Sequence, residues 1–126
     1  MGGLISVYSI CEYPQIFGGA ACLSTHWIGT FTIENNPIPA AFNNYLKNNL
    51  PDPATHKIYF GYGTESIDEF YEPFQMQLDS IMENKGYDDM NSKTMKFVGD
   101  DHSEIHWGKR FHIPITFLPE NTENSD

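Results

Sequence analysis

The sequence predicts an α/β fold in which about three parallel strands alternate with helices. Three short segments with strand character, residues 17–23, 56–62 and 95–98, are each followed by a segment with helical spacing. Strands that alternate with helices of this length imply right-handed crossovers and a parallel sheet. The 126 residues, of which 40% are apolar, are enough for one ordinary domain with a core, which excludes global disorder.

Helices are predicted over residues 2–11, 40–50, 67–85 and 104–118, where apolar side chains recur every three or four positions. The stripe of the first helix consists of Leu4, Tyr8 and Cys11. The stripe of the third helix consists of Phe70, Phe74, Leu78, Ile81 and Met82. The polar tail, residues 119–126, is expected to be disordered.

Composition excludes several classes of function. The chain has 7 basic and 17 acidic residues and a formal charge of −10, so it repels nucleic-acid phosphates and anionic lipid. No apolar run approaches the roughly 20 residues that a membrane-spanning helix needs. The two cysteines, Cys11 and Cys22, are too few for a disulfide framework or a cysteine-rich zinc site. They are expected to be buried thiols, with a single bridge as the alternative.

The turn after the second predicted strand carries three carboxylates, Glu65, Asp68 and Glu69. One interpretation is structural, because Ser66 and Glu69 have the spacing of a capping box and acidic side chains favour the start of a helix. The functional interpretation is that one carboxylate orients a histidine from the next strand-to-helix turn. The carboxyl ends of strands in an open α/β sheet are where ligands bind.

His102 is the histidine that follows the third predicted strand. A histidine at this position is suited to general acid–base chemistry, because its ordinary pKa lies near neutrality. The alternative is a metal site built from His102, Glu104 and His106. That spacing brings the three side chains together only in an extended segment, and the predicted start of a helix argues against it.

The opening residues, Met1-Gly2-Gly3-Leu4, have the character of a sharp turn that starts a helix. The nucleophile elbow of α/β-hydrolases, G-x-S-x-G, is such a turn, with small residues around the serine. A serine directly before Met1 would complete an elbow with Met1-Gly2-Gly3. The order of nucleophile, acid and histidine along the chain would then match that of these enzymes.

From Met1 to about Leu118 the chain resembles the C-terminal half of bacterial α/β-hydrolases of the esterase family that includes enterobactin-esterase-like and feruloyl-esterase-like enzymes. The segments that carry the resemblance are Met1-Gly2-Gly3-Leu4, Phe17-Gly18-Gly19-Ala20, Tyr62-Gly63-Thr64 with Asp68, and Asp101-His102-Ser103-Glu104 with Trp107 and Arg110. It implies a partial α/β-hydrolase fold over residues 1–118. It also implies a carboxylic-ester hydrolase with a small-molecule ester as substrate and no cofactor or metal.

The resemblance also assigns roles to particular residues. His102 matches the catalytic histidine, Asp68 the acid of the triad with Glu65 as the alternative, and the backbone N–H of Met1 one donor of the oxyanion hole. His26 and Trp27, after the first predicted strand, are weaker candidates for the lining of a substrate pocket.

The chain departs from the family pattern because it lacks the nucleophilic serine. Ser6 and Ser9 lie within the first predicted helix and Ser24 follows a different strand, so none of them replaces it. We therefore expect a half-enzyme that is inactive alone, with the N-terminal half outside the chain. The alternative is a non-catalytic interaction module that completes its sheet with another chain. Its uncharged strand around residues 20–23 would then be an open edge and a route to a homodimer.

Overall fold

The structure, a computed structural model, describes residues 1–119 and confirms an α/β architecture with a parallel three-stranded sheet. The predicted tail lies outside the described residues, apart from Pro119. In chain order the elements are α1 (Gly2–Glu12), β1 (Gly19–Leu23), α2 (Ile38–Asn49), β2 (Lys57–Gly63), the 3-10 helix η1 (Ser66–Phe70), α3 (Glu72–Lys85), β3 (Ser92–Phe97), α4 (Glu104–Arg110) and α5 (His112–Phe117).

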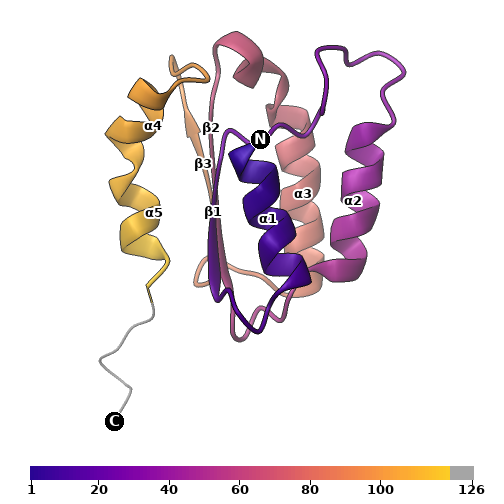
Figure 1. Ribbon diagram of the computed structural model, residues 1–126, viewed down its shortest axis with the longest axis vertical. Helices are drawn as coiled ribbons and strands as arrows, with labels where there is room; N and C mark the ends of the chain where they lie inside the picture. The colour runs from indigo at the N-terminus through magenta and orange to yellow at the C-terminus, as the bar shows by residue number, and fades with distance from the viewer. Residues whose placement is uncertain (120–126) are drawn as a thin grey trace.

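The sheet has the order β1-β2-β3, and both pairings are parallel. The helices α1, α2 and α3 cover one face of the sheet and α4 and α5 cover the other (Figure 1). Because both pairings are parallel, the carboxyl ends of all three strands lie at the same end of the sheet. Within residues 1–119, no helix is long and apolar enough to cross a membrane.

The main core lies between the sheet and α1, α2 and α3. It includes Ile10, Cys22, Leu46, Ile58, Phe60 and Leu78, which are almost completely buried. Both cysteines are free and buried here, on the adjacent elements α1 and β1. Burial in apolar surroundings raises the pKa of the Cys11 thiol to about 12 and that of Cys22 further still. The alternative of a single bridge is thus not observed.

Two predicted helices are each divided in the structure, and each division lies close to a proline. The predicted helix 67–85 consists of η1 and α3, and α3 begins with Pro73 in its first turn. The predicted helix 104–118 consists of α4 and α5, and Pro114 lies in the first turn of α5. Proline has no backbone N–H and fits the first turn of a helix, so it favours a new start at these points.

The prediction for the buried side of α1 was only partly right. Leu4 and Cys11 are buried as expected, whereas Tyr8 is exposed and Val7 and Ile10 take its place in the core. Apolar side chains occur on more than one side of this helix, so the spacing alone could not define the buried side. A helix with apolar residues on all sides is usually covered on all sides.

β1 forms one edge of the sheet and has no partner on its outer side among residues 1–119. The residues that flank it, Gly18 and Ser24, hydrogen-bond to β2. Because alternate residues point their backbone groups to opposite sides, those of Gly19, Ala21 and Leu23 point away from β2. β1 has no charged side chain, whereas the other edge strand, β3, has two lysines. Lysines protect an edge from association, so β1 is the unprotected edge.

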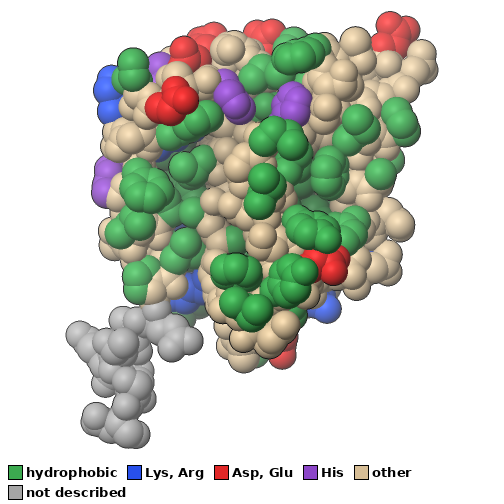
Figure 2. Space-filling model, in the orientation of Figure 1, with side chains coloured by type: hydrophobic (Ala, Val, Ile, Leu, Met, Phe, Trp, Pro, Cys, Tyr) green, Lys and Arg blue, Asp and Glu red, His purple; other side chains and the backbone are tan. Residues whose placement is uncertain are grey.

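The surface of α1 beside this edge is also apolar. Met1, Ile5 and Tyr8 are exposed there. Hydrophobic side chains gather over this face of the molecule (Figure 2). Exposed apolar side chains that gather on one face favour association or aggregation.

The turns that follow β2 and β3 are held together by a close approach of their backbones. The carbonyl oxygen of Asp100 accepts hydrogen bonds from the N–H groups of Thr64 and Glu65, both at 3.0 Å. A Cβ atom at Gly63 would overlap this same carbonyl group. Only glycine at position 63 lets the two turns meet.

Gly63→Ala is therefore expected to destabilise the protein by about 3 kcal/mol, since the added methyl group forces the two turns apart. Gly108→Ala is the matched control, because a Cβ at Gly108 on the exposed side of α4 meets no atom within 4 Å. That control should gain about 0.5–1 kcal/mol from the higher helix propensity of alanine. Unfolding in denaturant measures both effects. Equal stability of the two variants would contradict the close approach.

Self-association through β1 is expected at micromolar protein concentration and is measurable by light scattering. Ala21→Lys should reduce it, because a charge at the open edge opposes strand pairing and costs desolvation. Ala54→Lys adds the same charge at an exposed loop position and should leave association unchanged. A wild-type protein that is a monodisperse monomer with cooperative unfolding at high temperature would contradict an open edge.

Candidate active site

The polar residues of the candidate site follow the carboxyl ends of all three strands. Ser24 comes directly after β1, Asp68 lies in η1 after β2, and His102 lies in the turn after β3. They are far apart in the sequence, and hydrogen bonds join them in the structure. The parallel sheet brings them together, because its strands end side by side.

The contact predicted between His102 and Asp68 is present. His102 Nδ1 lies 2.8 Å from Asp68 Oδ1, and the carboxylate is completely buried while about a quarter of the histidine side chain, 27%, is exposed. Glu65, the alternative acid, is exposed and makes no hydrogen bond or ion pair with His102 within residues 1–119. The geometry therefore favours Asp68 as the partner of the histidine.

Asp68 Oδ2, the other carboxylate oxygen, accepts two more hydrogen bonds. The backbone N–H of Gly63 donates to it at 2.8 Å and the Ser24 hydroxyl donates at 2.6 Å. A buried carboxylate needs such donors to offset the loss of water. The capping-box interpretation of this turn is wrong, because Ser66 has a φ of 59° and no side chain caps η1.

The direction of the hydrogen bonds around Ser24 follows from the chemistry of its partners. The Ser24 Oγ atom accepts from Trp107 Nε1 at 2.9 Å and from Arg110 Nη2 at 3.4 Å. Indole and guanidinium groups can only donate, so the single hydroxyl hydrogen of Ser24 goes to Asp68. Sequence reasoning missed this role of Ser24. Its position directly after an apolar strand was the available signal.

The same reasoning defines the tautomer of neutral His102. An ionised Asp68 can only accept, so the hydrogen of the imidazole lies on Nδ1 and the lone pair lies on Nε2. The Nε2 atom makes no hydrogen bond to any residue that the structure describes. It is therefore free to take a proton from another group.

His102 lines a hollow of about 250 Å³ at the amino-terminal end of α1, which we call the His102 hollow. Its walls are Met1, Gly2, Gly3, Ser6, Ala21, Leu23, His102 and Trp107. Gly3 makes it possible for α1 to start here, because a Cβ atom there would lie 2.6 Å from Thr25 Oγ1 and 3.1 Å from the Leu23 carbonyl oxygen. A larger hollow, about 630 Å³, lies at the opposite end of the sheet beside His56 and Lys57 and contains none of the candidate residues.

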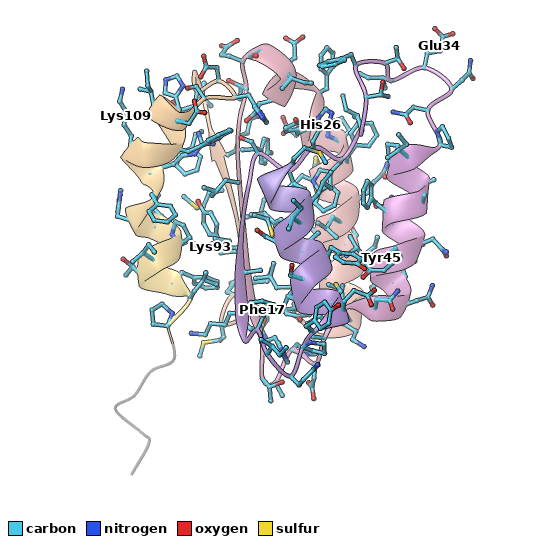
Figure 3. All side chains as sticks on the ribbon, viewed as in Figure 1. Phe17, His26, Glu34, Tyr45, Lys93 and Lys109 are labelled. Carbon is cyan, nitrogen blue, oxygen red and sulfur yellow. The ribbon has the colours of Figure 1, made fainter. Side chains whose placement is uncertain are left out.

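His26 lies at the same end of the molecule as the start of α1 (Figure 3). Its Nδ1 atom lies 2.8 Å from the hydroxyl of Tyr71, and the Tyr71 ring in turn contacts the ring of His102 at a centroid distance of 6.3 Å. Partial burial lowers the pKa of His26, and the positive charges of the Met1 amino group and of His102 lower it further. His26 is thus near the site but does not line the His102 hollow.

The prediction that Trp27 lines a substrate pocket is wrong. Trp27 is buried in the main core, where its ring packs against Phe42 and Phe60. Its Nε1 atom donates to Gln75 Oε1 at 3.0 Å. The aromatic side chain that does line the hollow is Trp107, whose ring lies 4.9 Å from that of His102.

The residues of the alternative metal site point to different partners. His102 contacts Asp68, whereas His106 Nδ1 lies 2.6 Å from Asp101 Oδ1. Glu104 is exposed in the first turn of α4. Hydrogen bonds from Ser103 and His106 lower the pKa of Asp101. No group of three or more potential ligands is placed to hold a metal ion in the part of the chain that the structure describes.

Chemically, this arrangement has the geometry that a general base requires. A buried carboxylate fixes the orientation of an imidazole whose free nitrogen is available at the edge of a hollow. Comparisons of the chain with family models, with curated proteins and with solved structures each found no significant match. The site is therefore described by its geometry alone. It is a carboxylate–imidazole pair at the carboxyl ends of parallel strands.

The lowered pKa of His26 predicts a pH dependence of stability. The unfolded state binds a proton at about pH 6.5 and the folded state only at lower pH, so stability falls as the pH drops below about 6.5. His26→Gln should remove this part of the loss and keep a polar partner for Tyr71. Denaturant unfolding between pH 5 and 8 tests it. Parallel curves for the wild type and the variant would exclude the effect.

Proposed function

We propose that this chain carries the acid and the histidine of a serine-type carboxylic-ester hydrolase, in a partial α/β-hydrolase fold. The observation that supports the proposal most directly is the 2.8 Å contact between His102 and the buried Asp68, at the ends of adjacent parallel strands. The order of strands and helices and the resemblance of the surrounding segments point to the same class.

In the proposed reaction, His102 Nε2 takes the proton of a serine hydroxyl as that oxygen attacks the ester carbonyl. Asp68 remains ionised and stabilises the imidazolium ion that forms. The same proton then passes from His102 to the leaving alcohol, and water repeats the sequence to release the acid. The Met1 N–H, as a peptide group, would donate to the developing oxyanion at the start of α1.

The serine itself must come from outside the described residues. The Ser6 hydroxyl donates to the Gly2 carbonyl oxygen within α1, at 2.8 Å. The Ser24 hydroxyl donates to Asp68, so its hydrogen is not available to the imidazole. The His102 hollow is bounded by Met1, so a serine directly before Met1 would lie beside His102. An in-frame Gly-x-Ser in the DNA upstream of Met1 would supply it.

A second function is favoured by the open edge of β1. Such an edge can pair with a strand of another chain, and the chain would then serve as a non-catalytic interaction module or a homodimer. The two functions differ in what lies upstream of Met1. Further strands and helices with a serine elbow favour the esterase, whereas their absence favours the module.

The chain alone is expected to hydrolyse p-nitrophenyl acetate no faster than its His102→Ala variant, because no hydroxyl group among residues 1–119 makes a hydrogen bond with His102 Nε2. A protein extended upstream to include the serine should hydrolyse it with saturation. Asp68→Asn in that extended protein should lower kcat by about 10⁴-fold, as expected when the wrong histidine tautomer is favoured. Steady-state kinetics measure each of these outcomes.

The matched control in the extended protein is Asp89→Asn, an exposed acid far from the hollow, which should retain full activity. Saturable hydrolysis by the unextended chain that vanishes in His102→Ala would show that one of its own residues is the nucleophile. An extended protein that contains the serine and remains inactive would overturn the esterase proposal.

A further inference from the structure

Four side chains, those of His102, Asp68, Ser24 and Trp107, form a closed ring of contacts. His102 Nδ1 meets Asp68 Oδ1 at 2.8 Å, Asp68 Oδ2 accepts from Ser24 at 2.6 Å, and Ser24 accepts from Trp107 at 2.9 Å. The ring of Trp107 then closes the circle, because its edge contacts the imidazole at a centroid distance of 4.9 Å and an angle of 80°. His102 is thus held on two sides by groups that are themselves joined through Ser24.

Ser24 hydrogen-bonds to Asp68, to Trp107 and also to Arg110, which lies outside this ring. We infer that Ser24 is a positioning residue, which joins Trp107 and Arg110 to Asp68 and so keeps Asp68 Oδ1 facing His102. This inference rests on the proposed function, since it concerns the same imidazole.

The backbone of Ser24 has a conformation that is unfavourable for a residue with a side chain. Its φ is 47°, in the left-handed region that favours glycine, and the residue is completely buried. Glycine would relieve this strain but would lack the hydroxyl group. The serine therefore satisfies a requirement of its side chain, and the side chain makes three hydrogen bonds.

Arg110 anchors the far side of the ring. Its guanidinium is buried, makes an ion pair with Asp100 at 2.7 Å and lies 4.5 Å from the centre of the Phe97 ring. Asp100 also binds the turn after β2 through its carbonyl oxygen. The donor that Arg110 presents to Ser24 is thus fixed by both turns of the site, which makes Ser24 a junction between rigid groups.

The hydroxyl matters because Asp68 has two equivalent oxygens. With Ser24 and Gly63 both bonded to Oδ2, the carboxylate can offer only Oδ1 to the histidine. Without the hydroxyl, one donor is lost, the carboxylate can rotate, and the preference of His102 for the Nδ1–H tautomer weakens. A net hydrogen bond contributes a factor of about 2 to 10 to such an equilibrium.

The test uses the chain as it exists, with ¹⁵N-labelled histidine, and needs no esterase activity. NMR spectra of neutral His102 should show mainly the Nδ1–H tautomer in the wild type. In Ser24→Ala and Ser24→Gly, the ratio of the Nδ1–H to the Nε2–H tautomer should fall by about 2- to 10-fold. The indole N–H resonance of Trp107 should move upfield in both variants, because its acceptor is gone.

Ser24→Gly helps to separate positioning from folding, since glycine is favoured at this φ and the relieved strain offsets part of the loss of the three hydrogen bonds. Ser80→Ala is the matched control, because the Ser80 hydroxyl bonds only within α3 and its loss should leave the His102 signals unchanged. A folded Ser24→Gly variant with the wild-type tautomer ratio would overturn the inference. A changed ratio in a chain whose extended form has no esterase activity would overturn the proposed function and leave the positioning role supported.

Discussion

The buried carboxylate of Asp68 is the group on which the rest of the site depends. Removing an ionised carboxylate from water costs far more free energy than one hydrogen bond returns, so it must be surrounded by donors. The structure supplies three, from Gly63, Ser24 and His102, and they come from three different segments of the chain. Satisfying one buried charge therefore fixes the mutual positions of all three strand ends.

This requirement explains why the turns that follow β1 and β2 are more polar than the strands themselves. β1 and β2 are uncharged except for Lys57 at the start of β2, and their alternate side chains, Ala20, Cys22, Ile58 and Phe60, pack into the main core. The positions of the site residues are fixed beyond the strands, where the turns after β2 and β3 meet at the Asp100 carbonyl group and the Gly63 backbone. The strands bring the turns to the same end of the sheet. The hydrogen bonds of the turns then determine which atoms come into contact.

The sequence allowed the three strands, their parallel order and the approach of His102 to Asp68 to be predicted, because each depends on local pattern and on the rule that parallel strands end together. The choice between Asp68 and Glu65 needed the structure, since it depends on the fold of η1. The burial of Trp27 and the hydrogen bonds of Ser24 could not be predicted from the sequence for a related reason. Both are set by contacts with residues more than forty positions away.

The two free thiols have a consequence for how α1 and β1 move. Cys11 and Cys22 lie in the apolar layer that joins these elements, and their raised pKa values leave almost no reactive thiolate at neutral pH. Alkylating reagents can reach them only after α1 separates from the sheet. The rate of alkylation therefore measures how often α1 separates from β1, independently of the histidine and of any ester.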